Sequence, residues 1–583
     1  MSGPKRIVEV ATRNALWGAV TGLIAGSLVG TLMQFQGMFA GNGSAVPSWA
    51  MFLGSATAVG GAIGVITDHR PRELAAAVSG GALVGMLGWL VIALTLNPLL
   101  DGTTPTWTVV AAASAYRTLV GAVLHGALTG AALHGLRSVR RPLAGSDTAP
   151  TVTLTRVVII GGGFAGVGAA KRFERLVLRG VTVDVTVISD SNFLLFTPML
   201  AEVASSALEP AHICAPVRSA VAHTRFRHGA VHDIDTTGRA VLMSGERVPY
   251  DHLVIAVGSV PSFLDLPGVE ENSFTMKDIA DATRLRDHVI AMLECCEQVT
   301  EPQERERLLT FVVAGGGFAG AETVAELFDL VHGVLHLYPG ITADEPRFVL
   351  VHSRDRILPE LSPQLGAYAL ERLRARGIGF RLGIRVSEAS SDAVVLSDGA
   401  RISTATFVWT AGTRPSPFVA RLPGEHARNG ALVTDATLRV CGLDQVWAVG
   451  DCARIPDLDQ AGEPFPPTAQ HALRQGRAVA DNIAAMIAGR PPVDFRFQAI
   501  GVLVALGHRT AAAEIRGHRF SGLGAWLLWR GIYLAKLPGA EKRVRVLLDW
   551  LLDLMFPRDV VVTSKSRAVA ATAPAPSANT GDR

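Results

Sequence analysis

The sequence predicts an α/β fold with two parallel-sheet units, preceded by an all-α transmembrane module and followed by amphipathic helices at the C-terminus. Three observations support this prediction. The hexapeptide Gly-Gly-Gly-Phe-Ala-Gly occurs twice, at 161–166 and 315–320, each time between an apolar strand and a helical pattern. The first quarter of the chain holds four long apolar stretches. Residues 541–556 alternate charged and apolar side chains at helical spacing.

Length and composition are those of a multidomain protein with membrane segments. The chain has 583 residues, of which 49% are hydrophobic, and its mean hydropathy is +0.31. The formal net charge of +3 is small for this length and Lys and Arg form no long block, so we expect no nucleic-acid partner. The five cysteines include no CxxC pair, which favours a reducing compartment, and we expect no metal site.

The four apolar stretches predict membrane-spanning helices in a module that ends at residue 136. Each is close to the ~20 residues that cross a bilayer, and they cover about 14–33, 49–67, 74–96 and 118–136. The first is too long for the core of a signal peptide, so we expect it to be retained. Lys and Arg lie on both sides of the module and within the loop between its second and third stretches, but the other two loops have none. By the positive-inside rule we expect a multi-pass protein of the plasma membrane whose later domains face the cytoplasm.

Small residues recur at every fourth position in three of these stretches. They are Gly18, Gly22, Gly26 and Gly30 in the first, Ala77, Gly81 and Gly85 in the third, and Ala122, Gly126 and Gly130 in the fourth. This spacing lets helix backbones approach closely and predicts a compact four-helix anchor. A transport pathway is the alternative, with Arg117, His125 and His134 as its ionisable candidates, although a histidine bonded between helices would explain the same pattern.

The repeated hexapeptide has the composition of a phosphate-binding turn. Glycine at its first position permits a tight turn, at its third a close approach to a pyrophosphate, and at its sixth close packing of the helix on the strand. Free N–H groups at the helix start then face the phosphates. Two copies predict two Rossmann-like units, each with a dinucleotide. The glycines concerned are Gly161, Gly163 and Gly166 in the first copy and Gly315, Gly317 and Gly320 in the second.

Each turn is followed by a second apolar strand that lacks the acid commonly used to bind the adenosine ribose. The strand 181–189 ends at Ser189, whose hydroxyl can still bond a ribose, and Asp190 follows. The strand 348–352 ends in a histidine, followed by Ser353 and Arg354. Arginine in this region can accept a 2′-phosphate, so NADPH stays open beside NADH, and a solvated surface arginine is the other explanation.

A third apolar strand, 445–449, ends in Gly450 and Asp451. Because it follows the second unit, it predicts that the chain returns to the first one, where Asp451 would bond the ribityl chain of a flavin. Considered alone, the same residues would predict only an Asx turn. Further on, Pro467 predicts the start of a helix, since proline is tolerated in the first helical turn.

Taken in order, these motifs resemble the two-dinucleotide flavoproteins, and among them the type II NADH dehydrogenases, which are single-chain NADH:quinone oxidoreductases that do not pump protons. The resemblance covers about residues 154–562 and excludes the four-span module. It implies tightly but non-covalently bound FAD in the first unit and NADH as co-substrate in the second. Disulfide reductases of the same fold need a cysteine pair soon after the first turn, but no cysteine lies between Gly166 and Cys214. The segments with the closest resemblance are 192–200, 317–322, 409–417, 467–476 and 529–539.

The resemblance also implies roles for single residues. Glu322 would lie beside the nicotinamide and the quinone, and Gln470 and Gln475 would border the quinone head. An acid in the first helical turn, favoured by the helix dipole, is the alternative explanation for Glu322. Arg474 stands where the family more often has glutamine. The remaining residues implied to contact a cofactor are Asn192, Gly412, Gly450 and Ala469.

We therefore expect a linker at 137–153, an FAD domain from 154–262 and 415–498, and a nicotinamide domain at 263–414. A membrane-associating region at 499–563 and a disordered tail at 564–583 would follow. Trp526, Trp529 and Tyr533 suit a membrane interface. The expected partners are a membrane quinone and the lipid bilayer, with a homodimer left open. A membrane-tethered redox sensor or scaffold is the alternative that is not an enzyme.

Overall fold

A computed structural model describes residues 16–31, 45–66, 74–92, 116–139, 154–221, 223–460 and 462–562. These form two compact units. The first comprises Met1–Pro150 with Gly539–Val544, and the second Thr151–Pro538 with Arg545–Arg583. The predicted tail at 564–583, most of the predicted linker, and the basic residues before the first span lie outside the described residues.

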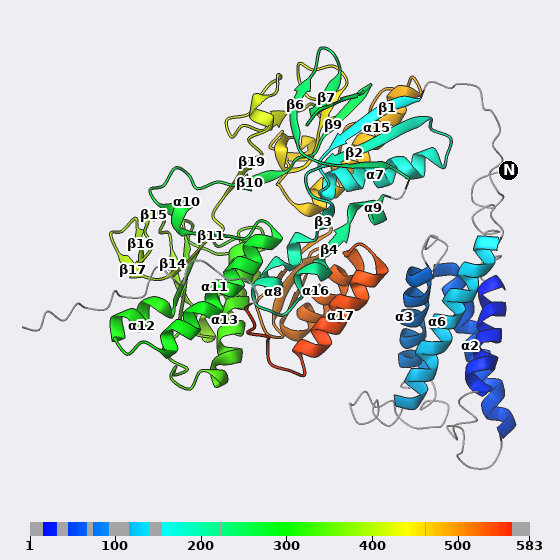
Figure 1. Ribbon diagram of the computed structural model, residues 1–583, viewed down its shortest axis with the longest axis horizontal. Coiled ribbons are helices and arrows are strands. Elements are labelled where there is room, and N and C mark those ends of the chain that lie inside the picture. Colours follow the sequence, from blue (N-terminus) through cyan, green and yellow to red (C-terminus); the bar gives the residue numbers. More distant parts are fainter. Residues whose placement is uncertain are drawn as a thin grey trace, which may run out of the picture. The chain divides into compact units, whose positions relative to one another are not determined.

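The first unit contains a helix at Leu16–Thr31 and the helices α2 (Ala45–Ile66), α3 (Leu74–Val91) and α6 (Tyr116–Val139) (Figure 1). Among the described residues, one helical segment, Leu119–Leu136, is long and apolar enough to cross a membrane. The apolar parts of the other three helices are shorter.

The small residues of the first unit do bring helix backbones together. A Cβ added at Gly81 of α3 would overlap the carbonyl of Gly126 in α6, and one at Gly22 would overlap α2 at Gly60. The buried ring of His125 lies 2.9 Å from the Gly22 carbonyl oxygen through its Nε2. The predicted close helix contact and the interhelical hydrogen bond of this histidine are confirmed.

In the second unit, the chain first builds a five-stranded parallel sheet. Its order is β21-β9-β1-β2-β5, so the late strand β21 lies beside β9 of the early part of the chain. Predicted strand 181–189 begins two residues later than expected, at Val183. The strands are β1 (Thr155–Ile160), β2 (Val183–Ser189), β5 (Arg225–His228), β9 (His252–Ile255) and β21 (Val446–Ala448).

A second five-stranded parallel sheet has the order β11-β18-β12-β13-β14. The short strands β10 (Ser259–Pro261) and β19 (Thr413–Pro415) pair with each other where the chain passes between the two sheets. The strands of the second sheet are β11 (Phe274–Thr275), β12 (Thr310–Ala314), β13 (Arg347–His352), β14 (Gly379–Leu382) and β18 (Thr406–Trp409).

The other small sheets of the described residues are antiparallel, except the parallel pair β20–β22. Two are three-stranded, β6-β7-β8 and β15-β16-β17, and a third, β23-β24-β25, forms the C-terminal hairpin region. Their bounds are β6 (Val231–Asp235), β7 (Ala240–Met243), β8 (Glu246–Pro249), β15 (Val386–Ala389), β16 (Ala393–Leu396), β17 (Arg401–Ser403), β23 (Gly501–Ala505), β24 (Ala511–Ile515) and β25 (His518–Ser521). The two-stranded pairs are β3 (Phe193–Leu195) with β4 (Cys214–Pro216), and β20 (Leu432–Val433) with β22 (Ala453–Arg454).

Helices pack against these sheets, and two long helices follow the hairpin near the C-terminus (Figure 1). The long helices are α7 (Phe164–Val177), α11 (Ile279–Glu297), α13 (Phe318–Val334), α14 (Pro363–Ala375), α15 (Ala469–Ile487), α16 (Gly522–Lys536) and α17 (Ala540–Asp553). The short ones are α8 (Leu200–Ala204), α9 (Val217–Ala220), α10 (Val269–Asn272) and α12 (Pro302–Leu308).

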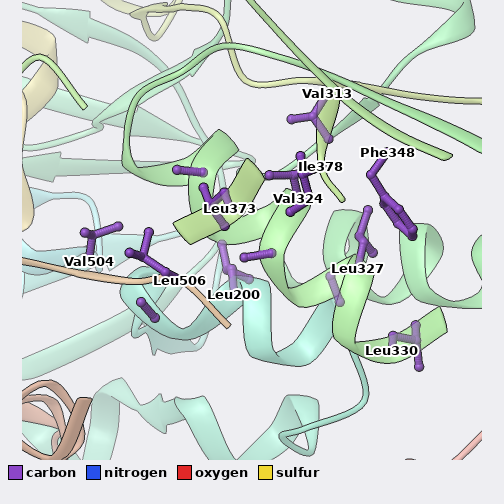
Figure 2. Packing of buried hydrophobic residues seen from close by; sticks show 14 of the residues in the cluster. Leu200, Val313, Val324, Leu327, Leu330, Phe348, Leu373, Ile378, Val504 and Leu506 are labelled. Carbon is purple, nitrogen blue, oxygen red and sulfur yellow. The ribbon is translucent and has the colours of Figure 1, made fainter. Parts of the chain in front are cut away.

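The largest hydrophobic core joins segments that are far apart in the sequence. Figure 2 shows Leu200 of α8 close to Val324 of α13, with Leu506 after β23 nearby. Trp529 of α16 belongs to this core and is only 2% exposed. The prediction that Trp529 lies at a membrane interface is therefore wrong, because its ring packs edge-on against Tyr533 at 4.7 Å.

Candidate functional site

The first glycine turn has the geometry of a phosphate cradle. Gly161 has φ +113°, a conformation that favours glycine, and its N–H donates to the Ile188 carbonyl oxygen at 2.8 Å. A Cβ at Gly166 would overlap the Gly161 carbonyl, so helix α7 can pack here only through glycine. Gly163 is the N-cap of α7, without a side-chain cap, and a Cβ there would meet open space. The free N–H groups of the first helical turn therefore face room for an anion.

The second glycine turn repeats this geometry. Gly315 also has φ +113°, and its N–H donates to the Val351 carbonyl oxygen at 2.8 Å. A Cβ at Gly320 would overlap the Gly315 carbonyl, and Gly317 caps α13 without a side-chain hydrogen bond. Both turns thus fit the pyrophosphate of a dinucleotide.

A cavity of about 130 Å³ is lined by residues of the late part of the chain, among them Gly450, Asp451 and Gln475. A Cβ at Gly450 would lie 3.4 Å from the side chain of Ala165 in the first turn. The buried side chain of Gln475 accepts a hydrogen bond from the Gly450 N–H at 2.9 Å. Asp451 Oδ2 accepts from the Ser259 hydroxyl at 2.7 Å. The three predicted residues Gly450, Asp451 and Gln475 are therefore brought together at one cavity.

Helix α15 begins at this cavity. Its first residue is Ala469, and its N-cap is Thr468, whose hydroxyl accepts the His471 N–H at 3.4 Å. The sequence favours a start at Pro467, but the threonine cap fixes the start two residues later. The positive end of the helix dipole faces the cavity and favours negative charge there.

The strand ends next to the two turns differ. Ser189 is buried, and its hydroxyl accepts from the Ser191 N–H at 3.3 Å, while Asp190 and Asn192 are exposed. A Cβ at Gly162 would press on the Ser189 hydroxyl, so this side chain lies directly against the first turn.

At the second turn, Nδ1 of His352 accepts the Gly316 N–H at 3.0 Å, whereas its buried Nε2 has no partner among the described residues. Burial, followed by the charge of Arg354, lowers the pKa of His352, so the ring is neutral at pH 7. Ser353 and Arg354 follow on the exposed surface. This contact between His352 and the turn was not predicted, although the substitution of a histidine for the usual acid was visible in the sequence.

Glu322 and Gln470 both contact the C-terminal hairpin. Glu322 Oε1 accepts the Ala505 N–H at 3.0 Å, and Gln470 Nε2 donates to the Gly501 carbonyl oxygen at 3.0 Å. Helix α13 has no acid in its first turn, so the alternative explanation for Glu322 as a first-turn acid is wrong. Burial, before all other causes, raises the pKa of Glu322 to about 8.

Several residues near the site were not predicted. Lys277 Nζ lies 3.7 Å from Asp451 and donates to the Ser259 hydroxyl at 2.7 Å. Cys452, next to Asp451, is fully buried, and burial raises the pKa of its thiol to about 11, so it stays protonated.

Two residues that the sequence analysis did name lie nearby. The carbonyl oxygen of the predicted residue Gly412 accepts a hydrogen bond from the Ser262 N–H at 3.0 Å, beside the β10–β19 pair. Arg474 stacks on the ring of Phe497, with its guanidinium carbon 4.2 Å from the ring centroid.

Two family models match the chain. Residues 155–476 match the pyridine nucleotide-disulphide oxidoreductases, and residues 500–559 match the NDH2 C-terminal domain. The first match spans more than half of the chain, from β1 to α15. The second covers the hairpin and both C-terminal helices.

Curated relatives agree with these matches. A probable NADH dehydrogenase from Dictyostelium discoideum is 31% identical over 421 residues, which cover 70% of this chain and 90% of the relative. A type II NADH:quinone oxidoreductase from Mycobacterium tuberculosis is 31% identical over 422 residues, which cover 69% and 89%.

Solved structures show the same fold. NDH2 from Plasmodium falciparum in complex with NADH superposes with a TM-score of 0.64 at 18% identity, covering 70% of this chain and 100% of that one. At this identity the likeness concerns the fold alone.

Proposed function

Because this chain belongs to the type II NADH dehydrogenases within the pyridine nucleotide-disulphide oxidoreductases, we propose that FAD binds at its first glycine turn and NADH at its second. The chain is an oxidoreductase that passes electrons from NADH through a flavin to a quinone. We assign 154–262 and 415–498 to the FAD domain and 263–414 to the nicotinamide domain.

The single observation that supports this division best is the placement of the cavity. Asp451 and Gln475 line it from the late part of the chain, and a Cβ on its lining residue Gly450 would lie 3.4 Å from the Ala165 side chain of the first turn. When bound there, the flavin would accept a hydride and pass on two electrons. Gly161, Gly163 and Gly166 would hold its pyrophosphate, and Asp451 its ribityl chain. Glu322, Gln470 and Gln475 would border the quinone.

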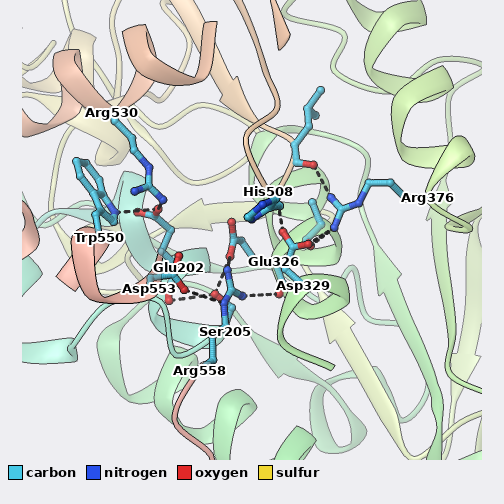
Figure 3. Close-up of polar contacts among 12 residues, drawn as sticks. Glu202, Ser205, Glu326, Asp329, Arg376, His508, Arg530, Trp550, Asp553 and Arg558 are labelled. Carbon is cyan, nitrogen blue, oxygen red and sulfur yellow. Dashed lines mark hydrogen bonds and ion pairs between the residues drawn. The ribbon is translucent and has the colours of Figure 1, made fainter. Parts of the chain in front are cut away.

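The outer surface of α17 supports a bilayer partner. Two of its acids face the protein, since Asp549 Oδ2 lies 2.5 Å from His212 Nδ1 and Asp553 Oδ1 lies 3.2 Å from Arg558 (Figure 3). Its Val546 and Trp550 are buried. Its leucines face outward instead, with Leu548 51% and Leu551 48% exposed. A soluble helix normally has the opposite arrangement. We therefore propose that this face enters a membrane interface, close to where a lipid-soluble quinone would arrive.

We further propose that the helices before residue 140 form a second, integral attachment with several spans. Two observations favour it: the small-residue contacts between these helices, and the exposed apolar side chains on them, such as Leu16 and Ile24 of the first helix. This attachment would place the catalytic domains on the cytoplasmic face of the plasma membrane.

Turnover measurements test the function. Purified chain should be yellow and should oxidise NADH with a soluble quinone at many turnovers per second. Gln475→Ala and Glu322→Gln should lower the quinone rate at least tenfold, and Glu371→Gln, an exposed carboxyl on α14, should not. A yellow protein reduced once by NADH without turnover would instead be a redox sensor.

The bilayer contact has its own test. In vesicles, Leu551→Glu should slow turnover with a long-tailed quinone several-fold but leave a short soluble quinone unaffected. Leu178→Glu, a 70% exposed position after α7, is the control. Equal rates for both variants with both quinones would contradict membrane docking by α17.

A second candidate, preference for NADPH, is favoured by the strand end at the second turn. His352 offers a buried Nε2 without a partner among the described residues, and Arg354 is exposed beside it. An acid at this position would repel a 2′-phosphate, whereas these two residues would not. His352→Glu should shift the ratio of kcat/KM toward NADH, and Arg354→Ala should weaken NADPH only.

A further inference from the structure

The two glycine turns share one backbone geometry but differ in what lies over them. A Cβ at Gly163 would meet open space, whereas a Cβ at Gly317, the equivalent residue of the second turn, would lie 3.8 Å from Oε1 of Glu360. Each of these glycines is the N-cap of its helix and lacks a side-chain cap. The second turn therefore has a carboxylate beside its helix N-terminus, and the first turn has none in the described residues.

The backbone just before Glu360 is attached to the second turn. Leu358 donates its N–H to the Gly316 carbonyl oxygen at 2.6 Å, and its side chain is fully buried. Leu358 has φ +50°, which is uncommon for a residue other than glycine, so the surrounding structure holds it in place. A guanidinium N–H of Arg356 donates to the Pro359 carbonyl oxygen at 2.9 Å. These contacts fix the point from which the Glu360 side chain extends.

The carboxylate of Glu360, in contrast, can move. The residue is exposed, and in the described part of the chain no hydrogen bond or ion pair engages its carboxylate. The positive end of the α13 dipole favours a negative charge at this place, so the side chain is stabilised over the turn without being tied to it.

A dinucleotide would bring a second negative charge to the same helix end. The free N–H groups in the first turn of α13 suit an anionic pyrophosphate, and they are the groups beside which Glu360 lies. Like charges a few ångströms apart at a protein surface repel each other, and salt screens this repulsion. Glu360 therefore opposes binding of a pyrophosphate at the second turn.

We propose that Glu360 makes the second turn an exchange site: its carboxylate lies over the helix end, gives way when NADH binds, and speeds release of NAD⁺ by repelling the pyrophosphate. This inference rests on the proposed binding of NADH at the second turn. One hexapeptide can then retain FAD at the first turn and let a nicotinamide dinucleotide leave at the second. Because NADH and NAD⁺ share the pyrophosphate, Glu360 weakens the binding of both and leaves the hydride transfer step unchanged.

Rapid mixing of the full-length holoenzyme with NADH tests this inference. Glu360→Gln keeps the size of the side chain and removes its charge, and Glu360→Ala removes both. We expect both variants to lower the Kd for NADH about fivefold, with the limiting rate of flavin reduction within about twofold of wild type. Glu360→Asp keeps the charge and should stay closer to wild type. Glu371→Gln, at the exposed carboxyl of α14, is the control and should match wild type.

ADP-ribose and salt separate the effect of charge from that of shape. ADP-ribose carries the pyrophosphate without the nicotinamide, so its inhibition constant should fall in Glu360→Gln by the same factor as the Kd for NADH. The difference between wild type and Glu360→Gln should shrink as the ionic strength rises from about 0.02 M to about 0.5 M, because salt screens the repulsion in wild type.

The possible results separate this inference from the proposed function. An equal or weaker affinity for NADH in Glu360→Gln would overturn the inference, although reduction of the flavin by NADH would still support the proposed function. Tighter binding in Glu360→Ala alone, with no dependence on salt, would mean that the side chain acts through its size, and this too would overturn the inference. A wild-type holoenzyme whose flavin NADH does not reduce would instead overturn the proposed function.

Discussion

The helices α7 and α13 start from the same six residues and then diverge. Their N-caps are Gly163 and Gly317. The fifth residue after the N-cap is Gly168 in α7 but Glu322 in α13. A Cβ at Gly168 would lie 3.0 Å from the Leu473 carbonyl oxygen, so α7 uses this position to pack against α15. Glu322 instead accepts the Ala505 N–H of the C-terminal hairpin. The two turns thus have the same geometry, and the next helical turn decides whether the helix packs against α15 or carries an ionisable group.

The last residues of β2 and β13, which lie next to the two turns, also differ in what they contact. The Ser189 side chain lies against the first turn, and within the described part of the chain its hydroxyl bonds only its own loop, through the Ser191 N–H. His352 bonds the second turn itself, through the Gly316 N–H. The first turn is therefore supported by packing, whereas the second also depends on a polar side chain.

The largest effect is expected when a methyl group is added at the last glycine of each turn. Gly166→Ala and Gly320→Ala each place a methyl group on the carbonyl of the first glycine, which costs about 3 kcal/mol by overpacking. If the two turns hold different cofactors, Gly166→Ala should give colourless protein. Gly320→Ala should stay yellow but resist reduction by NADH, while dithionite still reduces it.

Flavin absorbance per chain and stopped-flow reduction measure these outcomes. Gly333→Ala, on the open side of α13, is the control and should keep both properties. Loss of flavin in both turn variants, or in neither, would contradict the assignment of one cofactor to each turn.

Glu322, which stands in α13 where α7 has Gly168, predicts that the free energy of unfolding depends on pH. A carboxyl whose folded pKa is raised to about 8 holds a proton that the unfolded chain releases above its ordinary pKa. The stability contributed by this group is therefore complete at low pH and is lost as the pH rises toward 8. Between pH 6 and 8, Glu322→Gln should remove about 1 kcal/mol or more of the wild-type fall in unfolding free energy. Urea unfolding at both pH values measures this, and parallel curves would contradict the raised pKa.

The divergence between α7 and α13 also shows what the sequence could predict. The turns, the strands before them and the helix starts depend on local patterns, so they were predicted to within about two residues. The hydrogen bond between Glu322 and Ala505 joins positions 183 residues apart, and no local pattern encodes it. The burial of Trp529 and the surroundings of Glu202 depend in the same way on how distant helices pack.

A smaller effect is expected at the strand ends. His352→Ala removes the acceptor of the Gly316 N–H, which should raise the KM for NADH about fivefold, equivalent to about 1 kcal/mol, without loss of flavin. Ser189→Ala removes a hydroxyl that bonds only its own loop, so flavin content and the KM for NADH should both stay near wild type. Steady-state kinetics with flavin quantification separate the two. A larger flavin loss in Ser189→Ala than in His352→Ala would mean that the first strand end holds the ribose directly.

The smallest effect on stability is expected at the two glutamines of α15, the helix that packs against α7 and contacts the hairpin. Gln470 joins α15 to the hairpin through the Gly501 carbonyl, so Gln470→Ala should cost about 1 kcal/mol of stability and leave flavin content unchanged. Gln475 holds the Gly450 N–H beside the cavity, and its loss leaves a buried N–H unpaired, so Gln475→Ala should weaken flavin retention as well. Thermal unfolding and flavin release after dilution distinguish the two variants. Because both residues lie on one helix, a difference between them would locate the boundary between the flavin site and the hairpin within a turn and a half of α15, and equal flavin loss would place the hairpin in the flavin site too.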